Sequence, residues 1–122
     1  MARILLIDDD ELIRETLCMV LEDAGHQVLT AKNGRVGLSK LEQHPVDLII
    51  SDLFMPDMEG LETMRIIRQR QSNIKIIAIS GGALNLKQGM LLEDAELLGA
   101  DGSLSKPFHN RELISLVDQL LD

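Results

Sequence analysis

Short apolar runs alternate with longer amphipathic segments along the whole chain. We expect β-strands at the runs, which occupy residues 3–7, 26–30, 46–51, 74–79 and 102–104. The third and fourth runs are continuously apolar and rich in β-branched residues, as in central strands buried on both faces. Helices are expected at residues 11–24, 34–43, 59–71, 86–98 and 110–121. This order predicts an α/β fold of three layers, a doubly wound parallel sheet between helices.

Ionisable residues stand where several of these runs stop. Asp8 and Asp9 close the first run, Asp52 follows the third, and Lys106 follows the fifth after Ser105. In parallel sheets, ligand sites gather outside the carboxyl ends of the strands. We therefore expect three carboxylates and one ammonium group to meet at one edge of the sheet. This combination suits a divalent metal ion and a phosphoryl group.

The segment Asp8-Asp9-Asp10 has two interpretations. An aspartate between a strand and a helix commonly caps the helix N-terminus, and this reading stays open for any one of the three. Three adjacent carboxylates exceed what capping needs, since like charges about 4 Å apart repel by roughly 4 kcal/mol at an effective dielectric constant of 20. A hard cation relieves such repulsion, and Mg²⁺ prefers carboxylates, phosphate oxygens and water. The cluster therefore favours metal binding.

Three further residues fit phosphoryl chemistry at the same edge. Asp52 alone would be an ordinary turn residue, but a carboxylate beside a metal site can act as a nucleophile and form an aspartyl phosphate. Lys106 precedes Pro107, which restricts the backbone, so its ammonium group is placed to hold a phosphoryl oxygen. Ser80 offers a hydroxyl group, although Ser-Gly-Gly taken alone is more typical of a turn.

Four ordered motifs together resemble the receiver domain of two-component response regulators. They are residues 4–10, residues 52–60, Ser80 and residues 105–108. The resemblance covers essentially the whole chain, so residues 1–122 are expected to form one receiver domain. It implies a flavodoxin-like (βα)5 fold whose strands lie in the order 2-1-3-4-5. It also implies a regulator of the single-domain chemotaxis type.

The resemblance further implies where a metal ion and a phosphoryl group bind. Asp52 would accept a phosphoryl group from the phosphohistidine of a sensor histidine kinase or a histidine phosphotransfer protein. Asp9, Asp52 and the backbone carbonyl of Phe54 would hold Mg²⁺ directly, with Asp8 helping through water. Mn²⁺ is the expected substitute for Mg²⁺.

The same resemblance assigns the response to phosphorylation. Lys106 would contact the phosphoryl oxygens, Ser80 would move toward them, and the Lys106–Pro107 bond would be cis. Two features depart from the family pattern. Ser103 occupies the position of the usual aromatic switch residue, and the segment between Ser80 and Lys106 is longer than in compact receivers.

Composition narrows the location and the partners. Twelve basic and twenty acidic residues give a formal charge of -8, which argues against direct nucleic-acid binding. The first apolar run is too short for a signal peptide or membrane span, and Cys18 has no partner for an internal disulfide, so a cytoplasmic location is expected. We expect a monomer or weak homodimer that acts on a downstream protein.

Other functions fit the sequence less well. A phosphatase of the haloacid dehalogenase type needs Asp-x-Asp-x-Thr/Val; Asp8 and Asp10 fit, but Leu12 stands at the next required position. A flavin carrier would place its phosphate loop against three aspartates, and a phosphorylation-independent interaction module would not need the acidic set. His26, His44 and His109 are isolated, which disfavours a histidine phosphotransfer protein. We expect a phosphoacceptor that catalyses only its own phosphorylation and dephosphorylation.

Overall fold

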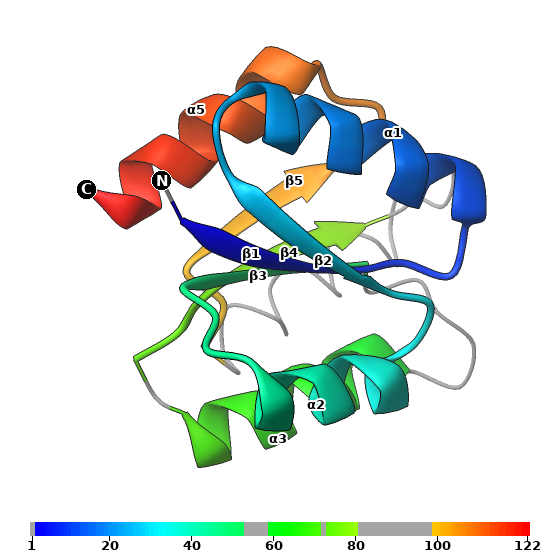
Figure 1. Ribbon diagram of the computed structural model, residues 1–122, viewed down its shortest axis with the longest axis vertical. Helices are drawn as coiled ribbons and strands as arrows, with labels where there is room; N and C mark the ends of the chain where they lie inside the picture. Colours follow the sequence, from blue (N-terminus) through cyan, green and yellow to red (C-terminus); the bar gives the residue numbers. More distant parts are fainter. Residues whose placement is uncertain (1, 53–58, 72, 81–98) are drawn as a thin grey trace.

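The computed structural model describes residues 2–52, 59–71, 73–80 and 99–122 of the chain. Its elements follow one another as β1 (Arg3–Ile7), α1 (Glu11–Asp23), β2 (Gln27–Ala31), α2 (Gly34–Gln43), β3 (Leu48–Asp52), α3 (Glu59–Arg70), β4 (Lys75–Ser80), β5 (Gly102–Ser105) and α5 (Asn110–Leu121). The strands form one five-stranded parallel sheet in the order β2-β1-β3-β4-β5 (Figure 1). The predicted fold class and strand order are confirmed.

The sheet lies between two helical layers, with α1 and α5 over one face and α2 and α3 over the other (Figure 1). Successive side chains of a strand point to opposite faces, and β1 feeds both cores in this way. Ile4 and Leu6 join the core under α1 and α5, whereas Leu5 and Ile7 join the core over α2 and α3. All five residues of β3 are buried, as expected for a central strand.

Several element boundaries differ from prediction by one or two residues. Strand β3 begins at Leu48 although Val46 is also buried, because an apolar residue can be buried before backbone pairing begins. Strands β3 and β4 extend to Asp52 and Ser80, so each polar residue is the last of its strand. Strand β2 is shifted one residue toward the C-terminus, and α1 and α3 each end one residue early. The helix predicted at residues 86–98 lies outside the described residues.

Two glycines with positive φ angles and one close contact are features of the backbone and the packing. Gly25, which follows α1, and Gly99 have φ angles of 97° and 104°, the left-handed region that glycine adopts without strain. Gly37 lets α2 approach β1, since a Cβ atom there would lie 2.6 Å from Cδ1 of Ile7. No helix in the described ranges is long and apolar enough to cross a membrane.

Arg68 of α3 ties together the loops that lead into β4 and β5. Its Nη1 donates to the carbonyl of Ile74 at 2.8 Å, and its Nη2 donates to the carbonyl of Gly99 and to Oδ2 of Asp101. Asp101 Oδ2 also accepts from the amide of Ile76 at 2.9 Å. These bonds hold the starts of β4 and β5 in place. At the far ends of these strands, Ser80 is the last residue of β4 and Lys106 directly follows β5.

Candidate functional site

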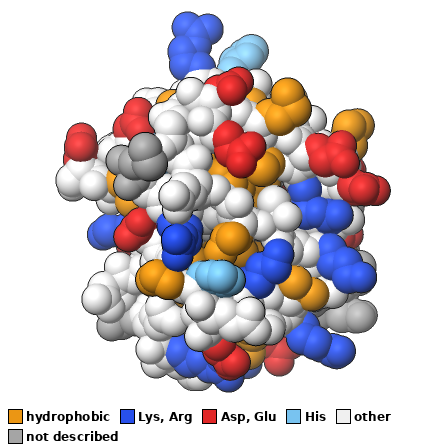
Figure 2. Space-filling view, in the orientation of Figure 1, with side chains coloured by type: hydrophobic (Ala, Val, Ile, Leu, Met, Phe, Trp, Pro, Cys, Tyr) orange, Lys and Arg blue, Asp and Glu red, His pale blue; other side chains and the backbone are white. Residues whose placement is uncertain are grey.

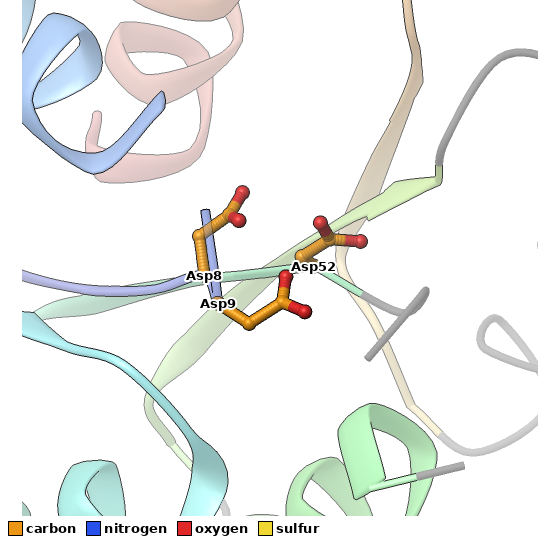
Figure 3. Close-up of side chains that lie close together, drawn as sticks. All are labelled: Asp8, Asp9 and Asp52. Atoms are coloured by element: carbon orange, nitrogen blue, oxygen red, sulfur yellow. The ribbon is translucent and has the colours of Figure 1, made fainter. Parts of the chain in front are cut away.

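Three aspartates meet at the carboxyl edge of the sheet because β1 and β3 are neighbours. The register pairs Ile7 with Ser51, which places the residues that follow, Asp8 and Asp52, beside each other. One carboxylate oxygen from each of Asp8, Asp9 and Asp52 lies within 4.8 Å of the others (Figure 3). The sequence separates the first two from the third by more than forty positions, and strand pairing removes that separation.

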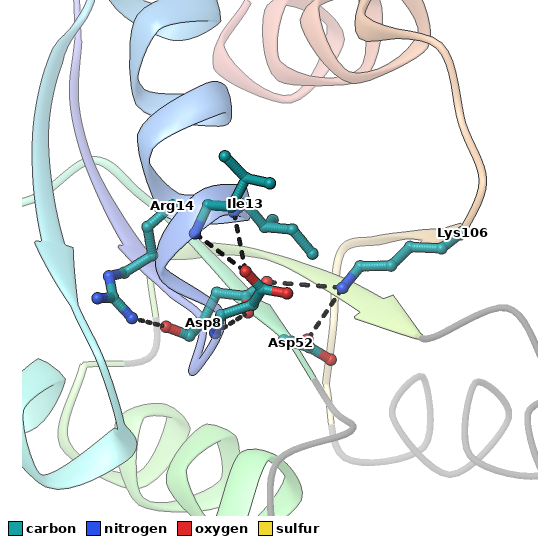
Figure 4. A network of polar contacts seen from close by, with 7 residues as sticks. Asp8, Ile13, Arg14, Asp52 and Lys106 are labelled. Carbon is teal, nitrogen blue, oxygen red and sulfur yellow. Dashed lines mark hydrogen bonds and ion pairs between the residues drawn. The ribbon is translucent and has the colours of Figure 1, made fainter.

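Lys106 brings a positive charge to this acidic cluster from the end of β5. Its Nζ lies 3.1 Å from Oδ2 of Asp52 and 3.6 Å from Oδ2 of Asp8 (Figure 4). The side chain is 22% exposed, so water screens these pairs less than it would on an open surface. The Lys106–Pro107 peptide bond is cis, as the resemblance implies.

Burial and charge change the protonation of Asp8. Only 1% of Asp8 and 3% of Asp52 is exposed, whereas Asp9 is exposed to solvent. Burial raises the pKa of Asp8 to about 6 from its ordinary value of 3.8. The backbone hydrogen bond from Asp10 opposes this rise, the charge of Asp52 adds to it, Lys106 opposes it, and Asp9 adds a smaller increase.

Backbone and side-chain hydrogen bonds hold the loop of residues 8–10. The amide of Asp8 donates to the carbonyl of Ala31 at 3.1 Å, and the amide of Asp10 donates to Oδ1 of Asp8 at 2.9 Å. Asp10 Oδ1 accepts from the amides of Leu12 and Ile13 at 3.0 and 3.2 Å. Asp10 is therefore the cap of α1, while Asp8 and Asp9 face the cluster. The sequence left helix capping open for any of the three aspartates, and in the structure Asp10 has this role.

Arg14 is a residue of this site that the sequence analysis did not identify. Its Nη1 donates to the backbone carbonyl of Asp8 at 2.7 Å (Figure 4). The sequence carries one signal that points to it. Arg14 is a cation near the start of α1, where the helix dipole disfavours positive charge. A cation at this unfavourable position suggests that its side chain makes a stabilising contact nearby.

The donor set fits a hard divalent cation. Oδ2 of Asp8 is buried and has no hydrogen-bond partner in the part of the chain that the structure describes. Its contact with the ammonium group of Lys106 is an ion pair at 3.6 Å, longer than a hydrogen bond, and the neighbouring carboxylates of Asp9 and Asp52 repel it. Mg²⁺ favours oxygen ligands of this kind, whereas Zn²⁺ sites are richer in His and Cys.

The other residues predicted for the site are only partly described. Ser80 is the last residue of β4 and pairs with Ser105 of β5, which places its backbone at the edge of the sheet that carries Asp52. The side chain of Ser80 and all of Phe54 lie outside the described residues. Ser103 lies within β5, opposite Ala78 of β4.

Comparison with known proteins gives one consistent family. Residues 4–118 match the response regulator receiver domain. A probable transcriptional regulatory protein of Picosynechococcus sp. is 37% identical over an alignment of 127 positions, which covers 98% of this chain and 49% of that protein. CpdR of Brucella abortus, a response regulator receiver protein, is 35% identical over 121 residues, which cover 99% of this chain and 98% of that protein.

A solved structure agrees over the full length of the fold. TrrA, a response regulator protein of Thermotoga maritima, was crystallised in complex with Mg²⁺-BeF. It has a TM-score of 0.85 and 36% identity, covering 99% of this chain and all of that chain. These similarities give no support to the phosphatase alternative.

The matches differ in how much of each relative they include. The chain spans about half the length of the transcriptional regulators that it matches first, but almost all of CpdR. Receiver domains of this kind are phosphoacceptor modules of two-component signalling and not enzymes in the ordinary sense. Sequence match, fold and relatives agree that this chain belongs to the response regulator receiver domain family.

Proposed function

We propose that this chain receives a phosphoryl group on Asp52 in a Mg²⁺-dependent reaction and that phosphorylation changes its binding to a downstream protein. The observation that carries the proposal is the placement of Asp52. It is buried at the end of β3, 3.1 Å from the ammonium group of Lys106, and it shares a cluster with Asp8 and Asp9. The phosphodonor is the phosphohistidine of a sensor histidine kinase or of a histidine phosphotransfer protein.

The transfer step is a substitution at phosphorus. A carboxylate oxygen of Asp52 forms the new O–P bond while the P–N bond of the phosphohistidine breaks, and the imidazole keeps the electron pair. Lys106 stabilises charge on the phosphoryl oxygens through its ammonium group. Later attack of water on phosphorus releases phosphate and restores the carboxylate, so the chain limits its own signal.

Asp9, Asp52 and the carbonyl of Phe54 would hold Mg²⁺, with Asp8 acting through water. When bound, the ion neutralises charge on the phosphoryl oxygens. Three carboxylates carry -3, and Mg²⁺ with Lys106 carries +3, so the loaded site is close to neutral. The complex of the Thermotoga maritima relative with Mg²⁺-BeF supports Mg²⁺ as the ion. Mn²⁺, which also accepts carboxylate ligands, should substitute.

Phosphorylation is the event that switches the surface. It replaces one negative charge on Asp52 with nearly two and adds acceptor oxygens, which attract Lys106 and the hydroxyl group of Ser80. Ser103 supplies no aromatic ring at the position of the usual switch residue, so the proposed response starts from Lys106 and Ser80 alone. We expect the protein to work as a monomer or weak homodimer in the cytoplasm.

The outer face of α1 is the proposed docking surface for the phosphodonor. Leu12 and Met19 are 71% and 64% exposed, and their spacing of seven residues puts them on one side of the helix. On the face of the molecule drawn in Figure 2, hydrophobic side chains lie in small groups among acidic and basic ones. Helix α1 begins beside Asp8 and Asp9, where a phosphohistidine must approach.

Asp52→Asn should abolish phosphorylation by acetyl phosphate with Mg²⁺ while leaving the fold intact, because the amide lacks the nucleophilic carboxylate. Mass spectrometry should find one base-labile phosphoryl group on the wild type and none on the variant. Asp23→Asn is the matched control, because it removes one exposed carboxylate at the end of α1, away from the site. Full phosphoryl incorporation in Asp52→Asn would show that another residue is the acceptor.

Asp9→Asn should make the metal-free protein more stable than the wild type yet nearly indifferent to Mg²⁺. The change removes one repelling charge and one ligand together. In the wild type, Mg²⁺ at tenfold excess over Kd should add about 1.4 kcal/mol to the free energy of unfolding. Thermal and urea unfolding in EDTA and in millimolar Mg²⁺ measures both effects.

Asp10→Asn is the control for this experiment. It removes a charge from the same loop, but asparagine caps a helix as well as aspartate does. This variant should therefore keep the wild-type response to Mg²⁺. An equal Mg²⁺ response in Asp9→Asn and the wild type would refute the assignment of Asp9 as a ligand.

The affinity for Mg²⁺ should fall as the pH drops below about 6, by up to about tenfold per pH unit, because the proton on Asp8 competes with the ion. Without metal, protonation of Asp8 has the opposite effect and stabilises the folded protein. The pKa of Asp8 is raised in the folded state, so its contribution to stability falls as the pH rises from 3.8 to about 6. Calorimetric titration with Mg²⁺ from pH 5 to 8 tests the first effect. Asp8→Asn should bind less tightly and with a flatter pH profile, and an equally steep profile would assign the effect to another group.

The double substitution Leu12→Ser with Met19→Ser should slow phosphotransfer from the cognate kinase but spare phosphorylation by acetyl phosphate. The change removes exposed apolar surface from α1 and leaves the acidic cluster intact. Arg65→Ser with Gln69→Ser, two exposed positions on α3, is the control. Kinase-dependent rates that match the wild type would place the docking surface elsewhere.

A further inference from the structure

We propose that Arg14 is a positioning residue that presets the loop of Asp8 and Asp9 for metal binding. The proposal rests on the Mg²⁺ site put forward above. Nη1 of Arg14 donates to the backbone carbonyl of Asp8 at 2.7 Å, a short hydrogen bond strengthened by the charge of the guanidinium group. The loop is thereby held from α1 as well as from the sheet.

The contacts of Arg14 are unusual for a helical arginine. Glu11 lies three residues earlier, a spacing at which opposite charges on a helix often pair. Within the described ranges, however, Arg14 makes no ion pair and its side chain turns back to the Asp8 carbonyl (Figure 4). It is also the fourth residue of α1, close to the end of the helix where the dipole disfavours a cation. Helix stability therefore does not explain this residue, whereas its contact with the loop does.

Asp9 is the residue that depends most on this contact. Asp8 is fixed at two points, because its amide donates to the carbonyl of Ala31 and its Oδ1 accepts from the amide of Asp10. In the part of the chain that is described, by contrast, no hydrogen bond or ion pair fixes the carboxylate of Asp9, and the residue is exposed. Its place in the cluster is set by the backbone on either side. Arg14 holds the peptide group that joins Asp8 to Asp9, so the guanidinium group positions a ligand that it does not touch.

Arg14 has two effects of opposite sign on Mg²⁺ binding. Its charge repels a second cation, and salt should screen that effect. Its hydrogen bond orders the loop before the ion arrives, which lowers the entropic cost of binding. We infer that ordering dominates, because the guanidinium group is bonded to the loop and not to a carboxylate of the cluster.

Arg14→Met tests the proposal, since methionine keeps part of the aliphatic stem and loses both the charge and the donor. Arg14→Lys keeps a charge and a single donor, and Arg65→Met removes an exposed arginine from α3 as the matched control. The first readout is the Mg²⁺ dependence of phosphorylation by acetyl phosphate. The second is hydrogen exchange of the Asp10 amide in metal-free protein, with the amides of Leu5 and Leu17 as references for global stability.

Arg14→Met should raise the Mg²⁺ concentration for half-maximal rate by about tenfold and leave the rate at saturating Mg²⁺ unchanged. The shift should persist in high salt. The Asp10 amide should exchange severalfold faster while the reference amides do not change. In both measurements Arg14→Lys should fall between the wild type and Arg14→Met, and Arg65→Met should match the wild type.

Two results would overturn the proposal. One is an unchanged or lower Mg²⁺ requirement in Arg14→Met, and the other is unchanged exchange of the Asp10 amide. Failure of the proposed function has a different signature, because wild-type protein would then show no response to Mg²⁺ at all. In that case the exchange measurement still decides whether Arg14 holds the loop.

Discussion

Repulsion among three carboxylates governs the carboxyl edge of this sheet. Asp8 and Asp9 follow β1, Asp52 ends β3, and the pairing of these neighbouring strands forces their oxygens to within 4.8 Å of one another. Two of the three residues are buried, so water screens little of the charge. The fold holds Asp8 and Asp52 there because each is fixed by a buried strand, β1 or β3, and moving either strand end would disrupt the core.

The surrounding elements each offset part of this repulsion. Strand β5 delivers the ammonium group of Lys106 to Asp52 and Asp8. Helix α1 points its N-terminus, the positive end of its dipole, toward the loop of the first two aspartates, and Arg14 adds a cation beside that loop. The pKa of Asp8 is still raised to about 6, chiefly because its carboxyl group is buried, and the negative charges of Asp52 and Asp9 add to the rise. A bound cation would stabilise the ionised carboxylates of this cluster.

The charge of this cluster gives the proposed switch its physical basis. A site that is nearly neutral with Mg²⁺ becomes negative again when Asp52 gains a phosphoryl group. Lys106 is already in contact with Asp52 and can follow the new oxygens, and the backbone of Ser80 lies at the same edge. The response can therefore start from local electrostatics, without the aromatic residue that Ser103 replaces.

The sequence was sufficient to predict the described strands and helices in their order along the chain, the parallel sheet, and the edge at which the candidate site residues gather. These features follow from hydrophobic periodicity and from the fact that carboxyl ends of parallel strands share one edge. Asp8, Asp52 and Lys106 could be selected because each stands where an apolar run stops. The family pattern then gave each of them a role.

The different contacts of neighbouring residues could be found only in the folded structure. There, Asp10 caps α1, β3 and β4 end at Asp52 and Ser80, and the Arg14 side chain turns back to the Asp8 carbonyl. Apolar periodicity reports which residues are buried, but it does not report where backbone pairing ends or how a long side chain turns. Those outcomes depend on contacts between segments far apart in the chain, and a local pattern carries no information about them.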